Sequence, residues 1–180
     1  MRSLVVDDSP TIRILVQHIL TVYGQCDVAQ NGQEAMDAHT RGLSDGRPYD
    51  LICLDLGLPY FDGIAVLSKI RAAEAQRQLP VKARIIVITA SREPGRVQKA
   101  IELGADGCLL KPVVAEQLIQ YLEDFGMVGA TTPSPAYREP IRQLEQMCDT
   151  DEIPVMVLAR IIRRMANSIE RQSSGRRTTE

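Results

Sequence analysis

The residues of this sequence best suited to chemistry follow short apolar stretches of the chain. Asp7 and Asp8 come directly after "LVV", and Asp55 ends the stretch "YDLICLD". Thr89 and Lys111 follow "ARIIVI" and "GCLL" in the same way. Adjacent carboxylates at the end of an apolar stretch repel each other and resist burial, so a binding partner must compensate for them.

These residue types indicate phosphoryl chemistry at a metal ion. Several carboxylate oxygens without histidine suit Mg²⁺, with Mn²⁺ as the alternative, and argue against zinc. A lysine and a hydroxyl near a metal-bound carboxylate could stabilise a phosphoryl group in transfer. An aspartate can act as the nucleophile and form an acyl phosphate. No serine or cysteine stands beside a histidine to suggest acyl transfer.

The elements that must position these residues alternate along the chain. Apolar stretches predict strands at 4–6, around "CDVA", and in "YDLICLDL", "ARIIVITA" and "GCLLKP". Helical periodicity predicts helices from Pro10 to before Gly24 and over 33–40, 64–76, 94–103 and 114–125. Ser9 is expected to cap the first helix, with Pro10 at its first position. Asn31–Gly32 and Asp62–Gly63 are interpreted as turns.

This order predicts an α/β fold, a doubly wound parallel sheet of five βα units. The continuous apolar strands are typical of a sheet covered on both faces. In such sheets ligands bind at the carboxyl ends of the strands, near the switch in strand order. Because the polar residues stand at four such ends, we expect them to converge on one pocket.

Composition restricts the class of protein. The chain has 180 residues, 44% of them apolar, and a formal net charge of −2, which does not favour a nucleic-acid protein. No run of about 18 apolar residues predicts a membrane span. A strand expected almost at the first residue leaves no room for a signal peptide, so a cytoplasmic location is expected. The cysteines are widely spaced and expected to be reduced thiols: Cys26, Cys53, Cys108 and Cys148. His18 and His39 are interpreted as structural or exposed.

Taken in order, "VVDD", "LICLDLGLP" with "FDG", "VITA" and "GADGCLLKP" resemble the receiver domain of two-component response regulators. The resemblance covers residues 2–125 approximately. It implies a flavodoxin-like (βα)5 fold with strand order 2-1-3-4-5. It also implies a function: Mg²⁺-dependent phosphoryl transfer from a phosphohistidine switches the surface of the domain and so an output interaction. The implied partner is a sensor histidine kinase or a phosphotransfer protein.

The resemblance assigns roles around the metal ion. Asp55 would be the phosphoacceptor. Asp8 and Asp55 would bind Mg²⁺ directly, together with the backbone carbonyl of Gly57, and Asp7 would hold the ion mainly through water.

The resemblance also assigns the switch residues. Lys111 would pair with Asp55 and then with the phosphoryl group, and Thr89 would bind a phosphoryl oxygen. The peptide bond before Pro112 would be cis. Members of the family usually carry Tyr or Phe three residues before the lysine, whereas this chain has Cys108. We therefore expect output to depend more on the backbone of the loop after Thr89, or on the C-terminal tail.

Three rival functions remain at this point. A phosphatase of the haloacid dehalogenase kind also uses an aspartate and Mg²⁺, but needs a second aspartate where this chain has Gly57. A receiver fold that no longer takes phosphate would not need the full set of site residues. A DNA-binding response regulator could use the arginine-rich C-terminal end. We expect no turnover of an outside substrate, only self-catalysed phosphorylation and dephosphorylation.

The C-terminal third has a different character. Residues 1–126 are expected to form the receiver domain, 127–137 a linker, 138–172 two amphipathic helices and 173–180 a disordered tail. One helix has an apolar stripe made of Leu158, Ile161, Ile162, Met165 and Ile169. The stripe is expected to dock on the receiver domain or on a second chain as a homodimer. DNA binding is not favoured, because no helix-turn-helix pattern is present.

Overall fold

Residues 1–59, 62–90 and 93–128 are the part of the chain that the computed structural model describes. Within it, strands and helices alternate. The strands are β1 (Arg2–Val6), β2 (Gln25–Ala29), β3 (Leu51–Asp55), β4 (Arg84–Thr89) and β5 (Gly107–Leu110). The helices are α1 (Pro10–Thr21), α2 (Gly32–Ser44), α3 (Gly63–Gln76), α4 (Pro94–Glu102) and α5 (Ala115–Asp124).

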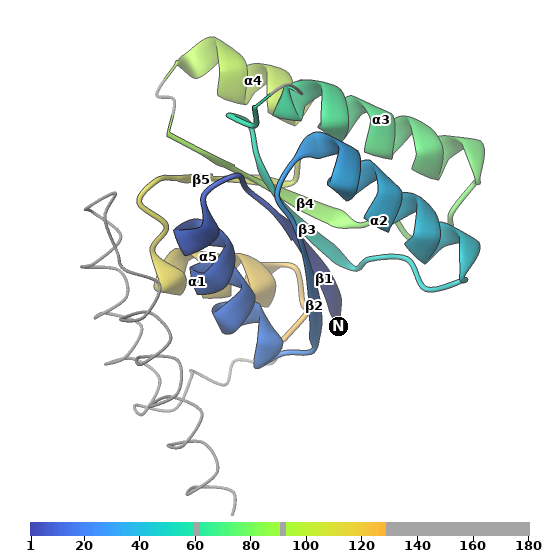
Figure 1. The fold of residues 1–180 in the computed structure, drawn as a ribbon, viewed down its shortest axis with the longest axis horizontal. Coiled ribbons are helices and arrows are strands. Elements are labelled where there is room, and N and C mark those ends of the chain that lie inside the picture. The colour runs from blue at the N-terminus through green and yellow to red at the C-terminus, as the bar shows by residue number, and fades with distance from the viewer. Residues whose placement is uncertain (60–61, 91–92, 129–180) are drawn as a thin grey trace, which may run out of the picture. The chain divides into compact units, whose positions relative to one another are not determined.

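The strands form one parallel sheet in the order β2-β1-β3-β4-β5 (Figure 1). Helices α1 and α5 cover one face, and α2, α3 and α4 cover the other. The predicted flavodoxin-like fold and strand order are therefore confirmed. The switch in strand order lies between β1 and β3, which brings the ends of these two strands together.

The core is aliphatic and is centred on β3. Every residue of β3 is buried, and so are the last five residues of β4. The edge strand β2 is only partly buried, and Val28 on it is 44% exposed. Burial on both faces explains why the central strands have continuous rather than alternating apolar sequences.

Two helix starts differ from the predictions. The side chain of Asn31 accepts a hydrogen bond from the amide of Glu34 at 2.9 Å, so Asn31–Gly32 begins α2 rather than forming a separate turn. Helix α2 therefore begins one residue earlier than predicted, and it also continues beyond the predicted end to Ser44. Ser9 stands at the N-cap of α1, but its side chain makes no capping hydrogen bond. Its amide instead donates to the Asp7 carboxylate at 2.9 Å, so the acidic pair and the helix start share one turn.

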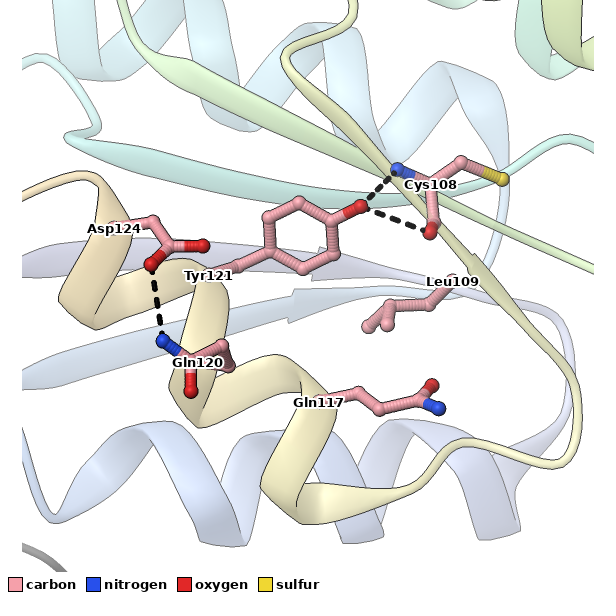
Figure 2. Close-up of a pocket in the computed structure, with 6 residues that line it drawn as sticks. All are labelled: Cys108, Leu109, Gln117, Gln120, Tyr121 and Asp124. Atoms are coloured by element: carbon pink, nitrogen blue, oxygen red, sulfur yellow. Dashed lines mark hydrogen bonds between the residues drawn. The ribbon is translucent and has the colours of Figure 1, made fainter.

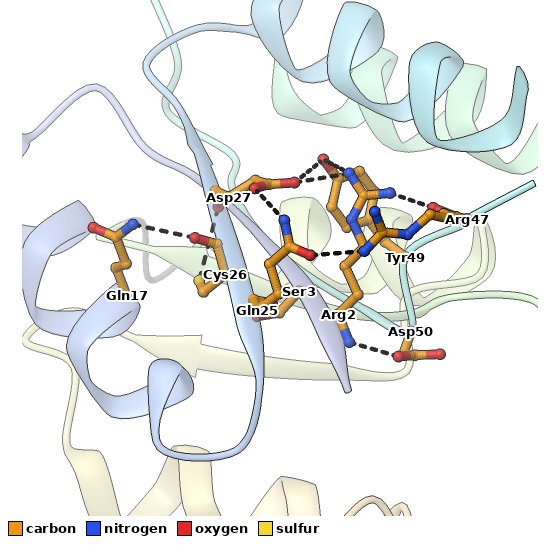
Figure 3. Close-up of polar contacts among 9 residues, drawn as sticks. All are labelled: Arg2, Ser3, Gln17, Gln25, Cys26, Asp27, Arg47, Tyr49 and Asp50. Carbon is orange, nitrogen blue, oxygen red and sulfur yellow. Dashed lines mark hydrogen bonds and ion pairs between the residues drawn. The ribbon is translucent and has the colours of Figure 1, made fainter. Parts of the chain in front are cut away.

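The amino ends of β1, β2 and the segment before β3 are joined by polar contacts (Figure 3). The Arg2 guanidinium donates to Asp27 at 2.9 Å and lies over the Tyr49 ring at 4.3 Å, while the Arg2 amide donates to Asp50 at 2.6 Å. Tyr49 also donates to Asp27 at 2.8 Å. Burial and this hydrogen bond raise the pKa of Tyr49 to about 12. These contacts explain why β1 begins at Arg2, two residues before the predicted strand.

Three cysteines of the described residues, Cys26, Cys53 and Cys108, are free thiols. His39 is buried in α2 and His18 is half-buried in α1. Among the described residues, the helices are too short or too polar to cross a membrane. The predicted extension at 138–172, the tail at 173–180, the apolar stripe and Cys148 lie outside the described residues.

Candidate functional site

The carboxylates of Asp7, Asp8 and Asp55 meet at the carboxyl ends of β1 and β3. One oxygen of each lies within 4.8 Å of those of the other two. Strand β1 pairs with β3 up to Val6 and Leu54, so the residues that follow emerge side by side. Asp7 is fully buried and Asp55 is 3% exposed, whereas Asp8 is exposed to solvent. The cluster therefore has a buried floor and one carboxylate open to solvent.

Lys111 supplies the positive charge of this cluster. Its Nζ lies 2.9 Å from Asp7 Oδ2 and 2.8 Å from Asp55 Oδ2, and 18% of its side chain is exposed. Burial, the largest influence, lowers the pKa of Lys111. The hydrogen bond to Asp55 and the charge of Asp7 outweigh burial and raise that pKa overall. The ammonium group is therefore held in its charged form between two acids.

Asp7 has the most perturbed environment of the three acids. Burial raises the pKa of Asp7 to about 6, although Lys111 opposes this shift. Its Oδ1 accepts the hydrogen bond from Ser9, while its Oδ2 is buried and accepts no well-aligned hydrogen bond, its contact with Lys111 being an ion pair. Two buried carboxylates and the exposed Asp8 face one ammonium group, which leaves excess negative charge in the cluster. This donor set fits a hard divalent cation such as Mg²⁺.

Both oxygens of Asp55 have partners on the protein. The amide of Gly57 donates to Oδ1 at 2.7 Å, and Lys111 donates to Oδ2 at 2.8 Å. The amide of Leu56 donates to the carbonyl of Ile88 at 3.1 Å and so extends the pairing of β3 with β4 by one residue. The orientation of the Asp55 carboxylate is thus fixed by its own loop and by Lys111, the residue after β5.

Thr89 and Pro112 complete the set of predicted residues on this edge. Thr89 is 2% exposed at the end of β4, and its carbonyl accepts the amide of Lys111 at 2.9 Å. The peptide bond between Lys111 and Pro112 is cis. The predicted residues of strands β1, β3, β4 and β5 therefore stand at one edge of the sheet, as the alternating pattern suggested.

Two residues of this edge have a role that the sequence did not indicate. Arg13 of α1 donates to the backbone carbonyls of Asp7 at 2.6 Å and of Asp8 at 2.8 Å. Gly63 packs so closely on β3 that a Cβ there would lie 2.2 Å from the carbonyl oxygen of Asp55. The "DG" pair is therefore more than a turn, because Asp62 caps α3 and Gly63 permits the close approach. In the sequence, the only sign of this close approach is the glycine at the start of the helix, Gly63.

Cys108 occupies the middle of the edge strand β5. The hydroxyl of Tyr121 lies 3.2 Å from both the amide nitrogen and the carbonyl oxygen of Cys108 (Figure 2). An open depression of about 410 Å³ lies alongside, lined also by Leu109, Gln117, Gln120 and Asp124. Figure 2 shows the thiol pointing away from Tyr121, and burial raises its pKa. Cys108 thus contacts Tyr121 of α5 through its backbone and not through its thiol.

Known proteins with similar sequences support one family. The family model for the response regulator receiver domain matches residues 3–123. The chain is 31% identical over 126 residues to the chemotaxis protein CheY homolog of Campylobacter jejuni, covering 69% of this chain and 91% of that protein.

Solved structures give the same result. The response regulator TrrA of Thermotoga maritima, solved in complex with Mg²⁺ and BeF, has a TM-score of 0.56 at 30% identity, covering 71% of this chain and 98% of that one. CheY of Borrelia burgdorferi, solved as a CheX-CheY-BeF3-Mg complex, has a TM-score of 0.58 at 29% identity, covering 69% and 89%. Receiver domains bind Mg²⁺ at an acidic pocket and interact with histidine kinases or phosphotransfer proteins. This chain belongs to the response regulator receiver domain family of two-component signalling.

Proposed function

We propose that Asp55 is the phosphoacceptor of this chain. It receives a phosphoryl group from the phosphohistidine of a sensor kinase or phosphotransfer protein. The observation that carries this proposal is the Asp55 carboxylate itself: nearly buried, next to two further acids, and hydrogen-bonded on separate oxygens by Gly57 and Lys111. A carboxylate held in one orientation is prepared for in-line attack.

The proposed reaction forms one bond and breaks one. A carboxylate oxygen of Asp55 attacks phosphorus, and an acyl phosphate forms. The phosphorus–nitrogen bond of the donor breaks, and its electron pair stays on the imidazole ring. Lys111, kept protonated by its raised pKa, lies beside Oδ2 and stabilises charge on the phosphoryl oxygens. Thr89 would donate its hydroxyl to one of these oxygens.

The residues that would hold Mg²⁺ are Asp8, Asp55 and the carbonyl of Gly57, with Asp7 acting mainly through water. Mn²⁺ is the alternative, because both ions prefer oxygen ligands. When bound, the ion would offset the negative charge of the carboxylates and of the incoming phosphoryl group. The exposed Asp8 faces solvent and is accessible to an arriving ion, while the buried Asp7 lies beside it in the same cluster.

We infer that the chain is not an enzyme on outside substrates, and that it catalyses only its own phosphorylation and dephosphorylation. The haloacid dehalogenase alternative needs a second aspartate two residues after the nucleophile. That position is Gly57, which offers only backbone groups. The output is proposed to be a protein interaction changed by phosphorylation. DNA binding or homodimerisation through the C-terminal segment remains the alternative route.

A phosphorylation assay tests this proposal. The full chain is incubated with acetyl phosphate and Mg²⁺, and intact mass is measured. Wild-type protein is expected to gain one phosphoryl group, while Asp55→Asn is expected to gain none. Asp37→Asn, an exposed acid on α2, is the control and should behave as wild type. No uptake by wild type, or equal uptake by Asp55→Asn, would show that Asp55 is not the phosphoacceptor.

A further inference from the structure

The peptide unit that joins Leu56 to Gly57 is held at both ends. Its N–H donates to Asp55 Oδ1 at 2.7 Å. Its carbonyl oxygen accepts a hydrogen bond at 2.7 Å from Nη2 of Arg96, in the first turn of α4. A single planar group therefore connects the carboxylate of Asp55 to the guanidinium of Arg96.

The same Arg96 nitrogen also reaches the start of α3. Nη2 lies 2.8 Å from Asp62 Oδ1, and this oxygen also accepts the amide of Ile64 as the N-cap of α3. Arg96 thus joins α4 to both ends of the loop that follows Asp55.

The ion pair between Arg96 and Asp62 lies at the protein surface. Its side chains are 38% and 54% exposed, and exposed pairs contribute little. The contact with the Leu56 carbonyl is different, because it is partly buried and charge-assisted, and such hydrogen bonds are stronger. A cation at the carbonyl oxygen also polarises the peptide and strengthens its N–H as a donor to Asp55.

The peptide unit is rigid, so its two ends move together. When either oxygen of Asp55 becomes the bridging oxygen of an acyl phosphate, the carboxylate charge is lost from both oxygens. Oδ1 is then a weaker acceptor for the N–H of Gly57. If the N–H of Gly57 turns toward a new acceptor, the carbonyl of Leu56 must turn away from Arg96. The chemical state of Asp55 is then felt at α4 without any change in a core side chain.

We propose that Arg96 is a positioning residue of the Asp55 site and that it transmits the state of Asp55 to α4 through the Leu56–Gly57 peptide. This inference rests on the proposed phosphorylation of Asp55. It assigns to α4 of this chain a direct polar connection with the phosphoacceptor loop. Substitution of Arg96 should therefore change the site and uncouple α4 from it.

The test uses the full chain, beryllofluoride with Mg²⁺ as the phosphoryl mimic, and amide NMR spectra. Arg96→Gln removes the charge and shortens the donor. Lys99→Gln is the matched control, an exposed charge on the same helix. Arg96→Lys keeps the charge without the forked donor and should restore the coupling in part.

Without beryllofluoride, the Gly57 amide proton of Arg96→Gln is expected to shift upfield, because its hydrogen bond to Asp55 weakens. Mg²⁺ should bind several-fold more weakly. With beryllofluoride, Gly57 should still respond, but the amides of α4 from Val97 to Glu102 should respond much less than in wild type and Lys99→Gln. Arg96→Gln is shown to be folded if it titrates as a single site and if its amide signals outside α4 and the Asp55 loop match those of the wild type. If it does not fold, Arg96→Lys is compared with Lys99→Gln instead.

Equal responses of α4 in wild type and both Arg96 variants would overturn the inference and leave the proposed function intact. A wild type that binds beryllofluoride without any response in α4 would do the same. A wild type that does not bind beryllofluoride would instead contradict the proposed function. In that case the upfield shift of Gly57 in Arg96→Gln still decides whether Arg96 positions the Asp55 loop.

Discussion

One ammonium group shared by two buried carboxylates is the central feature at the scale of residues. Lys111 lies within 2.9 Å of both Asp7 and Asp55, so its removal would leave two acids without a counter-charge. Loss of one partner from a buried charged cluster is strongly destabilising. Burial already raises the pKa of Asp7, with a smaller contribution in the same direction from the charge of Asp55, so the Lys111 ammonium is needed to keep both acids ionised.

Lys111→Met is therefore expected to destabilise the metal-free protein by about 3 kcal/mol. Adding Asp7→Asn in the same chain should recover part of this loss, because it removes one of the two repelling acids. Urea unfolding of the wild type, both single variants and the double variant in the presence of a chelator measures the coupling. Additive effects of the two substitutions would contradict a shared charge cluster.

The acids and the lysine can be located from the sequence because each follows an apolar strand. Arg13 and Arg96 cannot, because both lie on helices and donate to backbone carbonyls that a sequence pattern does not reveal. The same limit applies to Ser9, whose amide rather than hydroxyl holds Asp7. The strand pattern predicts the backbone position from which a side chain projects. It does not predict which long side chain reaches it from another element.

At the scale of elements, the contact between the start of α3 and the end of β3 shapes the site. Gly63 lets the helix approach until a Cβ would lie 2.2 Å from the carbonyl oxygen of Asp55 and 2.6 Å from Cα of Leu56. These are backbone atoms, so no side-chain rotation can relieve the overlap. The sequence placed the helix correctly to within one residue. The distance between two backbones, however, depends on tertiary packing that periodicity does not contain.

Gly63→Ala is expected to destabilise the protein by about 1–3 kcal/mol, because α3 must move away from the Asp55 loop. Gly95→Ala is the control, since a Cβ there meets nothing within 4 Å in the first turn of α4. It should be neutral or stabilising. Thermal unfolding of the two variants provides the comparison, and Mg²⁺ titration reports whether the loop has moved. Equal stability of Gly63→Ala and wild type would show that the two elements can separate without cost.

At the scale of the whole molecule, buried histidine makes stability depend on pH. His39 is 2% exposed, and its Nδ1 has no hydrogen-bond partner. Burial lowers the pKa of His39. Glu74 opposes this shift, while Arg77 at the C-cap of α3 and Arg71 within α3 reinforce it. As pH falls through the unfolded value of about 6.5, the unfolded chain takes up a proton that the folded chain does not. Stability must then fall with decreasing pH.

Other groups also titrate in or near this range. Burial lowers the pKa of His18 in the same direction as His39. Asp7 acts in the opposite sense, since its pKa is raised to about 6 and the folded state is favoured by protonation there. Asp27, whose pKa is lowered by Tyr49 and Arg2 against the effect of burial, loses its contribution only below its usual range. The change in the free energy of unfolding of the wild type with pH is thus a sum of opposing contributions. Only the difference in stability between the wild type and a variant without His39 isolates the contribution of that residue.

His39→Gln keeps a polar side chain of similar size but cannot titrate. Its stability relative to wild type should therefore rise as pH falls from 7 to 5, by at most about 1.4 kcal/mol per pH unit, the limit for one proton. Urea unfolding of both proteins at several pH values in one chelator-containing buffer series measures this difference. His18→Gln, at a half-buried position, should show a smaller change. A difference between His39→Gln and wild type that stays constant with pH would mean that His39 is protonated equally in the folded and unfolded chains, despite its burial between α2 and α3.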